Sequence, residues 1–272
     1  MAEKHSGRRA PGTPGRPLRV VVIGNSCVFL TVPAASGVDD DAYPGWLAEL
    51  LLDRGVTASV AVHSQWHTTT KEALPRFESW VRDELPDVVV VNLGIVDAQA
   101  RVLPTWLLRN TMTWLPGQGG GARVYRTRVV PRLQPRVRAW QRFWAGRVGP
   151  KASRVRPAVF ERSMARLLQL CARQCNAHVV VLDIDPPNER LLHFMPGLDA
   201  RVARYNAILE RVVAREPAGR ATLLPTSQVV ATDPDRLLPD GIHRSAEGHR
   251  RVAECLADEL VRLGPLLGVR ID

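Results

Sequence analysis

The chain has 272 residues, of which 45% are hydrophobic, and a formal net charge of +10. That hydrophobic share is enough for a full core, which excludes a chain that is disordered throughout. No apolar run approaches the roughly 20 residues of a membrane-spanning helix, and residues 1–17 lack the apolar centre of a signal peptide. We therefore expect a cytoplasmic protein without a transmembrane segment.

Alternating strand and helix patterns predict the fold class. Continuous β-branched runs, typical of strands buried on both faces, span residues 18–24, 57–63, 86–94, 177–185 and 221–225. Helical apolar spacing falls at residues 46–53, 71–85, 158–175, 198–215 and 245–263. This order predicts an α/β three-layer sandwich with a mostly parallel five-stranded sheet, as in flavodoxin-like folds. Residues 1–17 are predicted to be a flexible basic tail, and residues 18–272 a single domain.

One segment, residues 101–157, interrupts the alternation. It holds thirteen Lys or Arg residues, no Asp or Glu, several aromatic residues and a GQGGG run. The segment is several times longer than an ordinary connection between a strand and a helix. We therefore interpret it as a basic, aromatic-rich insertion that forms a lid, a binding arm or a partner surface, or an arginine-rich subdomain packed by its own tryptophans.

The four cysteines lie mostly in apolar segments, which predicts buried thiols and not a disulfide framework. They are Cys27, Cys171, Cys175 and Cys255. Cys171 and Cys175 are four residues apart and could share a metal, but no second pair of ligands with zinc spacing accompanies them. We expect neither a metal nor a cofactor.

Two short motifs carry residues suited to nucleophilic catalysis. Ser26 follows the first predicted strand, and Asp240 and His243 lie three residues apart just before the last predicted helix. Ligands of parallel α/β sheets bind beyond the carboxyl ends of the strands, so these segments could meet there. His243 could then accept the proton of Ser26 as a general base, while Asp240 orients its ring. The sequence thus predicts a Ser26–His243–Asp240 triad.

These motifs resemble the conserved blocks of the SGNH (GDSL-type) hydrolase superfamily. Gly24-Asn25-Ser26 is similar to the G-D-S of the first block, residues 93–97 to the third, and residues 240–243 to the D-x-x-H of the fifth. The resemblance covers about residues 18–97 and 158–263. It implies a serine esterase or acyl-transfer fold with Ser26 as the nucleophile. It also implies that substrate-side positions are held by Asn25, Gly94, Asp97 and Gln99, although we expect Asp97 chiefly to brace the loop.

Two positions depart from the pattern of that superfamily. Val96 stands where the third block has an asparagine that donates to the oxyanion hole. The second block has no glycine, so the resemblance leaves the backbone amides of His67 and Ser26 to form the oxyanion hole. Losing one such donor costs about 2.7–4 kcal/mol, which favours an activated acyl donor unless Asn92, Gln99 or the insertion supplies a substitute. We expect His63 to be structural, and His67 could either line the pocket or meet solvent.

The primary hypothesis is a serine acyl hydrolase or acyltransferase that acts on an acyl-bearing small molecule or acyl donor. The basic insertion favours an acidic carrier protein or a phosphate-bearing donor; nucleic acid and a membrane surface are weaker alternatives. The alternative from another class is a catalytically silent binding module that uses the insertion to hold an anionic macromolecule. Val96 and the missing glycine favour this second hypothesis.

Overall fold

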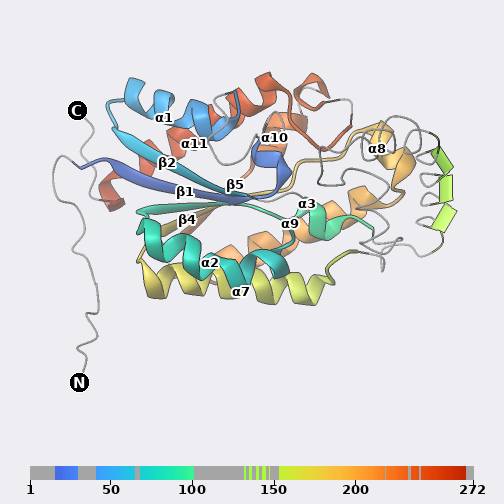
Figure 1. The fold of residues 1–272 in the computed structure, drawn as a ribbon, viewed down its shortest axis with the longest axis horizontal. Coiled ribbons are helices and arrows are strands. Elements are labelled where there is room, and N and C mark those ends of the chain that lie inside the picture. The colour runs from blue at the N-terminus through green and yellow to red at the C-terminus, as the bar shows by residue number, and fades with distance from the viewer. Residues whose placement is uncertain are drawn as a thin grey trace, which may run out of the picture.

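The computed structural model places five strands in one parallel sheet with the order β2-β1-β3-β4-β5 (Figure 1). The strands are β1 (Leu18–Gly24), β2 (Ala58–Ser64), β3 (Val88–Asn92), β4 (His178–Leu182) and β5 (Ala221–Leu224). The structure describes residues 16–29, 41–64, 68–100, 153–217, 219–231, 234–238 and 240–267, with eight single positions between 132 and 147. The predicted sheet is confirmed, and each predicted strand lies within two or three residues of the observed one.

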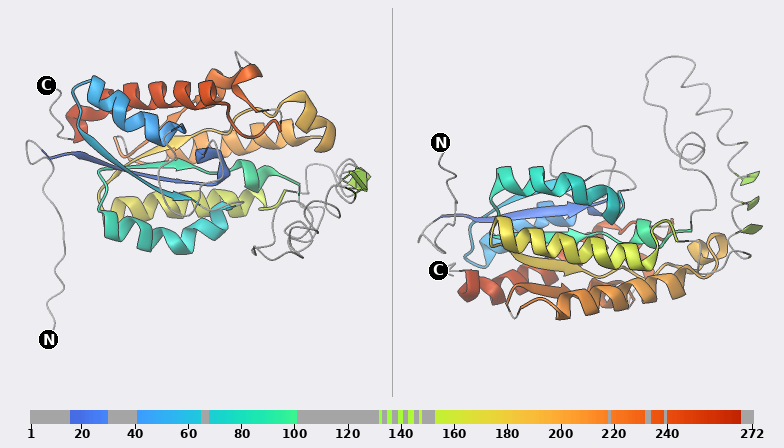
Figure 2. Two further views of the ribbon diagram at one scale, coloured as in Figure 1. Left: turned by 45° about the horizontal axis from the view of Figure 1, so that its top comes forward. Right: turned by 90° about the horizontal axis from the view of Figure 1, so that it is seen from below.

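Helices cover both faces of the sheet, which makes the three layers seen in the two views of Figure 2. One face is covered by α1 (Tyr43–Asp53) and α11 (Ala246–Leu267), and the other by α2 (Thr70–Glu84), α7 (Pro157–Gln174) and α9 (Leu198–Ala214). The short elements of the described residues are η1 (Ser26–Val28), α3 (Ile95–Ala98), α8 (Glu189–Phe194), α10 (Thr226–Ala231) and η5 (Pro234–Arg236).

Burial on both faces explains why the strands are continuously apolar. Successive side chains of a strand point to opposite faces. In β1, Val20 and Val22 therefore pack in the core under α1 and α11, while Val21 and Ile23 pack under α2, α7 and α9. Burying such side chains contributes about 1.5–3 kcal/mol each. Both faces of the sheet thus need apolar residues, and the polar residues gather where the strands end.

The basic insertion leaves and re-enters the fold at one place. Ala100 and Ser153 form an antiparallel bridge, and the amide of Arg154 donates to the carbonyl of Gln99 (2.8 Å). Most of the segment between these residues lies outside the described part of the chain, as does nearly all of the predicted tail. Arg16, at the end of that tail, pairs with Asp87.

None of the described helices combines the length and apolar character needed to span a membrane. The predicted cytoplasmic location stays a prediction.

Candidate active site

Ser26 lies in a tight turn directly after β1. Close packing requires glycine at the strand end, because a Cβ on Gly24 would lie 2.4 Å from Cγ1 of Val28. Asn25 then caps η1, since its Oδ1 accepts from the amide of Cys27 (3.0 Å). The hydroxyl of Ser64, at the end of β2, donates to the Asn25 carbonyl (2.7 Å). These contacts hold Ser26 at the carboxyl edge of the sheet.

The loop before α11 orients its own histidine. Oδ1 of Asp240 accepts from the amides of Ile242 (2.9 Å) and His243 (3.0 Å), which closes a tight turn. The other carboxylate oxygen, Oδ2, lies 2.7 Å from Nδ1 of His243. Burial raises the pKa of Asp240, but these hydrogen bonds outweigh it and hold the pKa below its ordinary value. The carboxylate is therefore ionised at neutral pH.

The second ring nitrogen of His243 faces the serine. Nε2 of His243 lies 2.9 Å from Oγ of Ser26. An ionised carboxylate only accepts hydrogen bonds, so Nδ1 must carry the ring proton and Nε2 accepts from the Ser26 hydroxyl. The structure thus brings together the three predicted residues, in the tautomer that allows His243 to take the serine proton.

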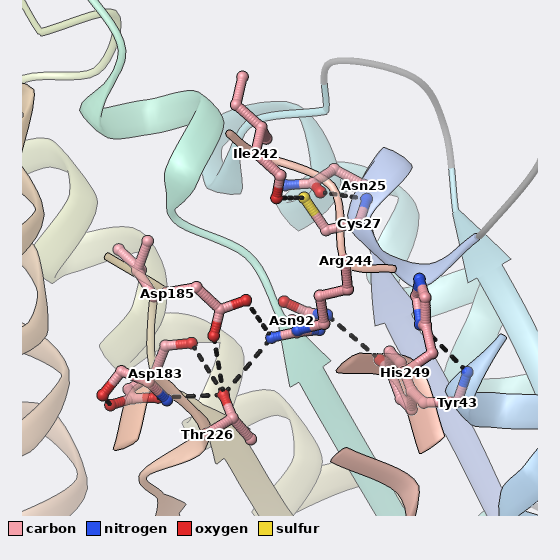
Figure 3. A network of polar contacts seen from close by, with 12 residues as sticks. Asn25, Cys27, Tyr43, Asn92, Asp183, Asp185, Thr226, Ile242, Arg244 and His249 are labelled. Atoms are coloured by element: carbon pink, nitrogen blue, oxygen red, sulfur yellow. Dashed lines mark hydrogen bonds and ion pairs between the residues drawn. The ribbon is translucent and has the colours of Figure 1, made fainter. Parts of the chain in front are cut away.

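Cys27, beside Ser26, is a buried thiol that joins two parts of the site. Its Sγ lies 3.8 Å from the carbonyl oxygen of Ile242, next to His243 (Figure 3). Burial raises the pKa of this thiol to about 12. The thiol is therefore neutral at physiological pH and a poor nucleophile. All four cysteines are free thiols.

The loop after β3 carries the other predicted site residues. Gly94 caps α3 with φ 131°. Val96 is 2% exposed and packs in the core under α2, α7 and α9. Its hydrocarbon side chain has no hydrogen-bond donor. Gln99 is the C-terminal cap of α3, and its backbone carbonyl accepts from the amide of Arg154, where the chain returns from the insertion.

Asp97 lies in the same loop and is directed at α2. Its carboxylate accepts from the amide (3.0 Å) and the hydroxyl (2.6 Å) of Thr70, and it is fully buried. Burial raises the pKa of Asp97 to about 7, against the opposing effect of the Thr70 hydrogen bonds. In this position the side chain braces the loop against α2 and does not face solvent.

Two other histidines were candidates in the sequence, His63 and His67, and the structure describes only the first. His67 lies outside the described residues, so its predicted oxyanion role stays a prediction. The ring of His63 stacks on Trp80 with 5.4 Å between the ring centroids, and its Nε2 atom lies 3.7 Å from Oε1 of Glu84. Burial lowers the pKa of His63. These contacts place its ring against α2.

A polar group next to the triad was not predicted from the sequence; it is formed by Asp183, Asp185, Thr226 and Arg244. Arg244 follows His243 directly, and its guanidinium lies 2.7 Å from Asp185. Two aspartates, Asp183 and Asp185, at the carboxyl end of the predicted strand 177–185 were the available signal, because ligands bind where strands of a parallel sheet end.

A serine, a histidine and an aspartate in this order of contact, at the carboxyl edge of a parallel sheet, define a serine hydrolase of the α/β class. The family model of the GDSL-like lipase/acylhydrolase family matches residues 22–251. The chain belongs to this family, which makes it an SGNH-type serine hydrolase and supports acyl hydrolase activity. No curated protein is similar enough in sequence to count as a match.

Solved structures share the fold. The crystal structure of TesA is 20% identical, with 90% of this chain and 99% of that chain covered and a TM-score of 0.57. A lipase/acylhydrolase from Enterococcus faecalis is 15% identical, with 94% and 98% covered and a TM-score of 0.60. The acetylxylan esterase Axe2 from Geobacillus stearothermophilus is 15% identical, with 96% and 99% covered and a TM-score of 0.58. At these identities the likeness concerns the fold alone.

Proposed function

We propose that the chain transfers acyl groups through an acyl-Ser26 intermediate, with His243 as general base and Asp240 as the residue that orients it. The observation that carries the proposal is the 2.9 Å separation of the Ser26 Oγ and His243 Nε2 atoms. The hydroxyl already donates toward the base, so no rearrangement is needed to start proton transfer. The side chain of His243 is 23% exposed, which leaves the pair open to a substrate.

The reaction proceeds in two halves. As Oγ of Ser26 bonds to the carbonyl carbon, its proton passes to Nε2 of His243 and the carbonyl electron pair becomes an oxyanion. Collapse of that intermediate expels the leaving group, which takes the proton from His243. Water or another acceptor then attacks the acyl-enzyme while His243 removes its proton, and Ser26 is regenerated. The amides of Ser26 and His67 are the proposed oxyanion donors.

An activated acyl group suits this site better than a simple ester. The core position of Val96 leaves the third block without the side-chain donor of the family pattern. Losing one donor stabilises the oxyanion less and lowers kcat roughly a hundred- to a thousandfold. A thioester or another activated donor has a lower barrier and tolerates that loss.

A basic groove supports an anionic donor. A space of about 560 Å³ opens between the first turns of α2 and α7, and it is lined by Lys71, Arg76, Arg154 and Arg156, with Glu72 as its acid. Such an excess of cations attracts phosphate groups and acidic surfaces. We therefore infer a phosphate-bearing or carrier-bound acyl donor as the preferred substrate.

The nucleophile is tested with a fluorophosphonate probe and p-nitrophenyl acetate. We expect the parent protein to be labelled at Ser26 and to hydrolyse the ester, and Ser26→Ala to lose both. Ser79→Ala is the matched control, because Ser79 is an exposed residue of α2 whose hydroxyl donates to the backbone carbonyl of Arg76 in the same helix. Labelling that persists in Ser26→Ala would exclude Ser26 as the nucleophile.

The donor is tested by comparing acetyl-coenzyme A, a phosphate-bearing thioester, with an uncharged acetyl thioester. We expect Arg76→Gln combined with Arg156→Gln to raise KM for the phosphate-bearing thioester at least fivefold and to leave the uncharged one unchanged. Arg82→Gln, an exposed cation near the opposite end of α2, is the control. Equal KM changes for the two thioesters would show that the groove does not bind the phosphate groups of the donor.

The silent binding module remains the second candidate, favoured by Val96. It predicts salt-dependent retention on heparin together with no probe labelling and no ester turnover. Labelling of Ser26 would contradict it.

A further inference from the structure

A buried ion pair lies directly behind the triad histidine. Arg244 is the residue after His243 and is 1% exposed. Its Nη2 lies 2.7 Å from Oδ2 of Asp185, whose side chain is 11% exposed. Asp185 follows β4, so the pair joins the loop that carries Ile242 and Arg244 to the segment after β4 (Figure 3). At that distance the contact is a charge-assisted hydrogen bond.

Asp185 belongs to a polar cluster that is itself anchored. The hydroxyl of Thr226 donates to Oδ1 of Asp183 (3.0 Å) and lies 3.4 Å from Nη2 of Arg244. The amide of Ser227 donates to the same Asp183 oxygen (2.7 Å). The guanidinium is therefore held at a point where β4 and α10 meet, and a shift of Arg244 would disturb several hydrogen bonds.

The guanidinium has few other partners. Its Nε and Nη1 atoms are buried and make no hydrogen bond within the described part of the chain. Arg244 lines a cavity of about 20 Å³ together with Cys27 and Ile242, the neighbours of Ser26 and His243. A space of this size accommodates roughly one water molecule. Asp185 thus balances the positive charge of Arg244, because no second carboxylate pairs with it in the described residues.

Within the described residues, the other hydrogen bonds of this loop are local or weaker than the ion pair. The hydrogen bonds of Asp240 orient the imidazole within its own loop, but they do not tie that loop to the sheet. The contact from the Cys27 thiol to the Ile242 carbonyl does reach the turn after β1, but at 3.8 Å a thiol is a weak donor. The ion pair is the stronger connection between the loop and the strand ends.

We propose that Arg244 and Asp185 form a positioning pair that keeps the imidazole of His243 within hydrogen-bonding distance of Ser26. The pair touches no reacting atom and acts through the backbone that Arg244 shares with His243. The inference rests on the proposed function for its kinetic consequence. Its structural consequence, the placement of His243, is independent of any acyl chemistry.

The kinetic test uses Arg244→Met, Asp185→Asn and the double variant, with p-nitrophenyl acetate as substrate. We expect each single variant to lower kcat at least tenfold and to change KM less than threefold. The double variant should lose no more than the worse single variant, because the pair acts as a unit. Arg244→Lys keeps the charge and should recover part of kcat.

The double variant also distinguishes a loss of positioning from a loss of folding. A single substitution leaves one buried charge unpaired, whereas removing both charges does not. Thermal unfolding establishes that each variant is folded at the assay temperature. A folded double variant with kcat within threefold of the parent would overturn the proposal.

Arg54→Met is the matched control. Arg54 lies 2.7 Å from Asp258 and joins α1 to α11, away from the strand ends. This variant should leave kcat unchanged. A kcat loss equal to that of Arg244→Met would show a general effect of losing an ion pair.

A measurement without substrate separates this inference from the proposed function. The ¹⁵N chemical shift of His243 Nε2 should change when Ser26→Ala removes its hydrogen-bond partner. In the Arg244→Met background, the same substitution should change that shift little, because the two groups are already apart. A full change there would overturn the positioning role, even for a protein that hydrolyses no ester.

Discussion

The Oγ atom of Ser26 and the Nε2 atom of His243 lie 2.9 Å apart although 217 positions separate them in the sequence. The parallel sheet explains this contact. The turn that carries Ser26 follows the carboxyl end of β1, and the loop of His243 reaches the same edge after β5. A parallel arrangement brings all strand ends of one polarity to one edge, so residues from both ends of the chain can share a proton.

Asp240→Asn should lower kcat about ten-thousandfold. The asparagine carbonyl can still accept from the amides of Ile242 and His243, which keeps the turn. Its NH₂ group then faces Nδ1 of His243, so the ring proton moves to Nε2, which can no longer accept from Ser26. Steady-state kinetics with an activated ester measures the loss. A kcat within threefold of the parent would contradict the assigned tautomer.

Val96→Asn should raise kcat for unactivated esters roughly a hundred- to a thousandfold, because one oxyanion donor is worth about 2.7–4 kcal/mol. Val96 is 2% exposed in the core, so the polar side chain should also lower the free energy of unfolding by about 1–3 kcal/mol. Val96→Leu, close to asparagine in size but without a hydrogen-bond donor, is the control. Hydrolysis rates of an alkyl ester distinguish them. Equal rates in both variants would show that the position does not face the oxyanion.

Gly94→Ala should lower the free energy of unfolding by about 3 kcal/mol. Gly94 has φ 131°, and its added Cβ would lie 2.6 Å from Cδ1 of Ile184. Gly219→Ala is the control: its φ of 80° also favours glycine, but no described atom lies within 4 Å of the Cβ. We expect about 1 kcal/mol there. Urea denaturation compares the two, and equal losses would mean that the contact with Ile184 relaxes.

Asp97→Asn should remove part of the pH dependence of stability. The pKa of Asp97 rises from 3.8 to about 7 on folding because the carboxyl is buried. The unfolded chain therefore releases this proton at lower pH than the folded protein. The free energy of unfolding falls as pH rises from about 4 to about 7, by up to roughly 1.4 kcal/mol per pH unit, and levels off above.

Asparagine keeps an acceptor for the amide and hydroxyl of Thr70 but has no proton to lose. Urea denaturation between pH 5 and pH 8 should thus show a stability gain of Asp97→Asn over the parent that grows up to about pH 7. Asp258→Asn, which changes an exposed carboxylate, should follow the parent. A constant difference between Asp97→Asn and the parent at every pH would count against the raised pKa.

The sequence by itself determined the layers of the fold and the chemical identity of the triad. Strands buried on both faces must be continuously apolar, so residues such as Val88–Asn92 are recognisable without coordinates. A serine after the first strand and a D-x-x-H segment before the last helix are likewise local patterns. Their contact could be expected only because parallel strands end at one edge.

Tertiary structure alone decided which side chains meet there. The pairing of Arg244 with Asp185 depends on the position of β4 in the sheet, which no local pattern encodes. The burial of Val96 and the direction of Asp97 toward Thr70 also follow from packing between elements. Local patterns report which face of an element is apolar, whereas distances between polar groups depend on how the elements are stacked.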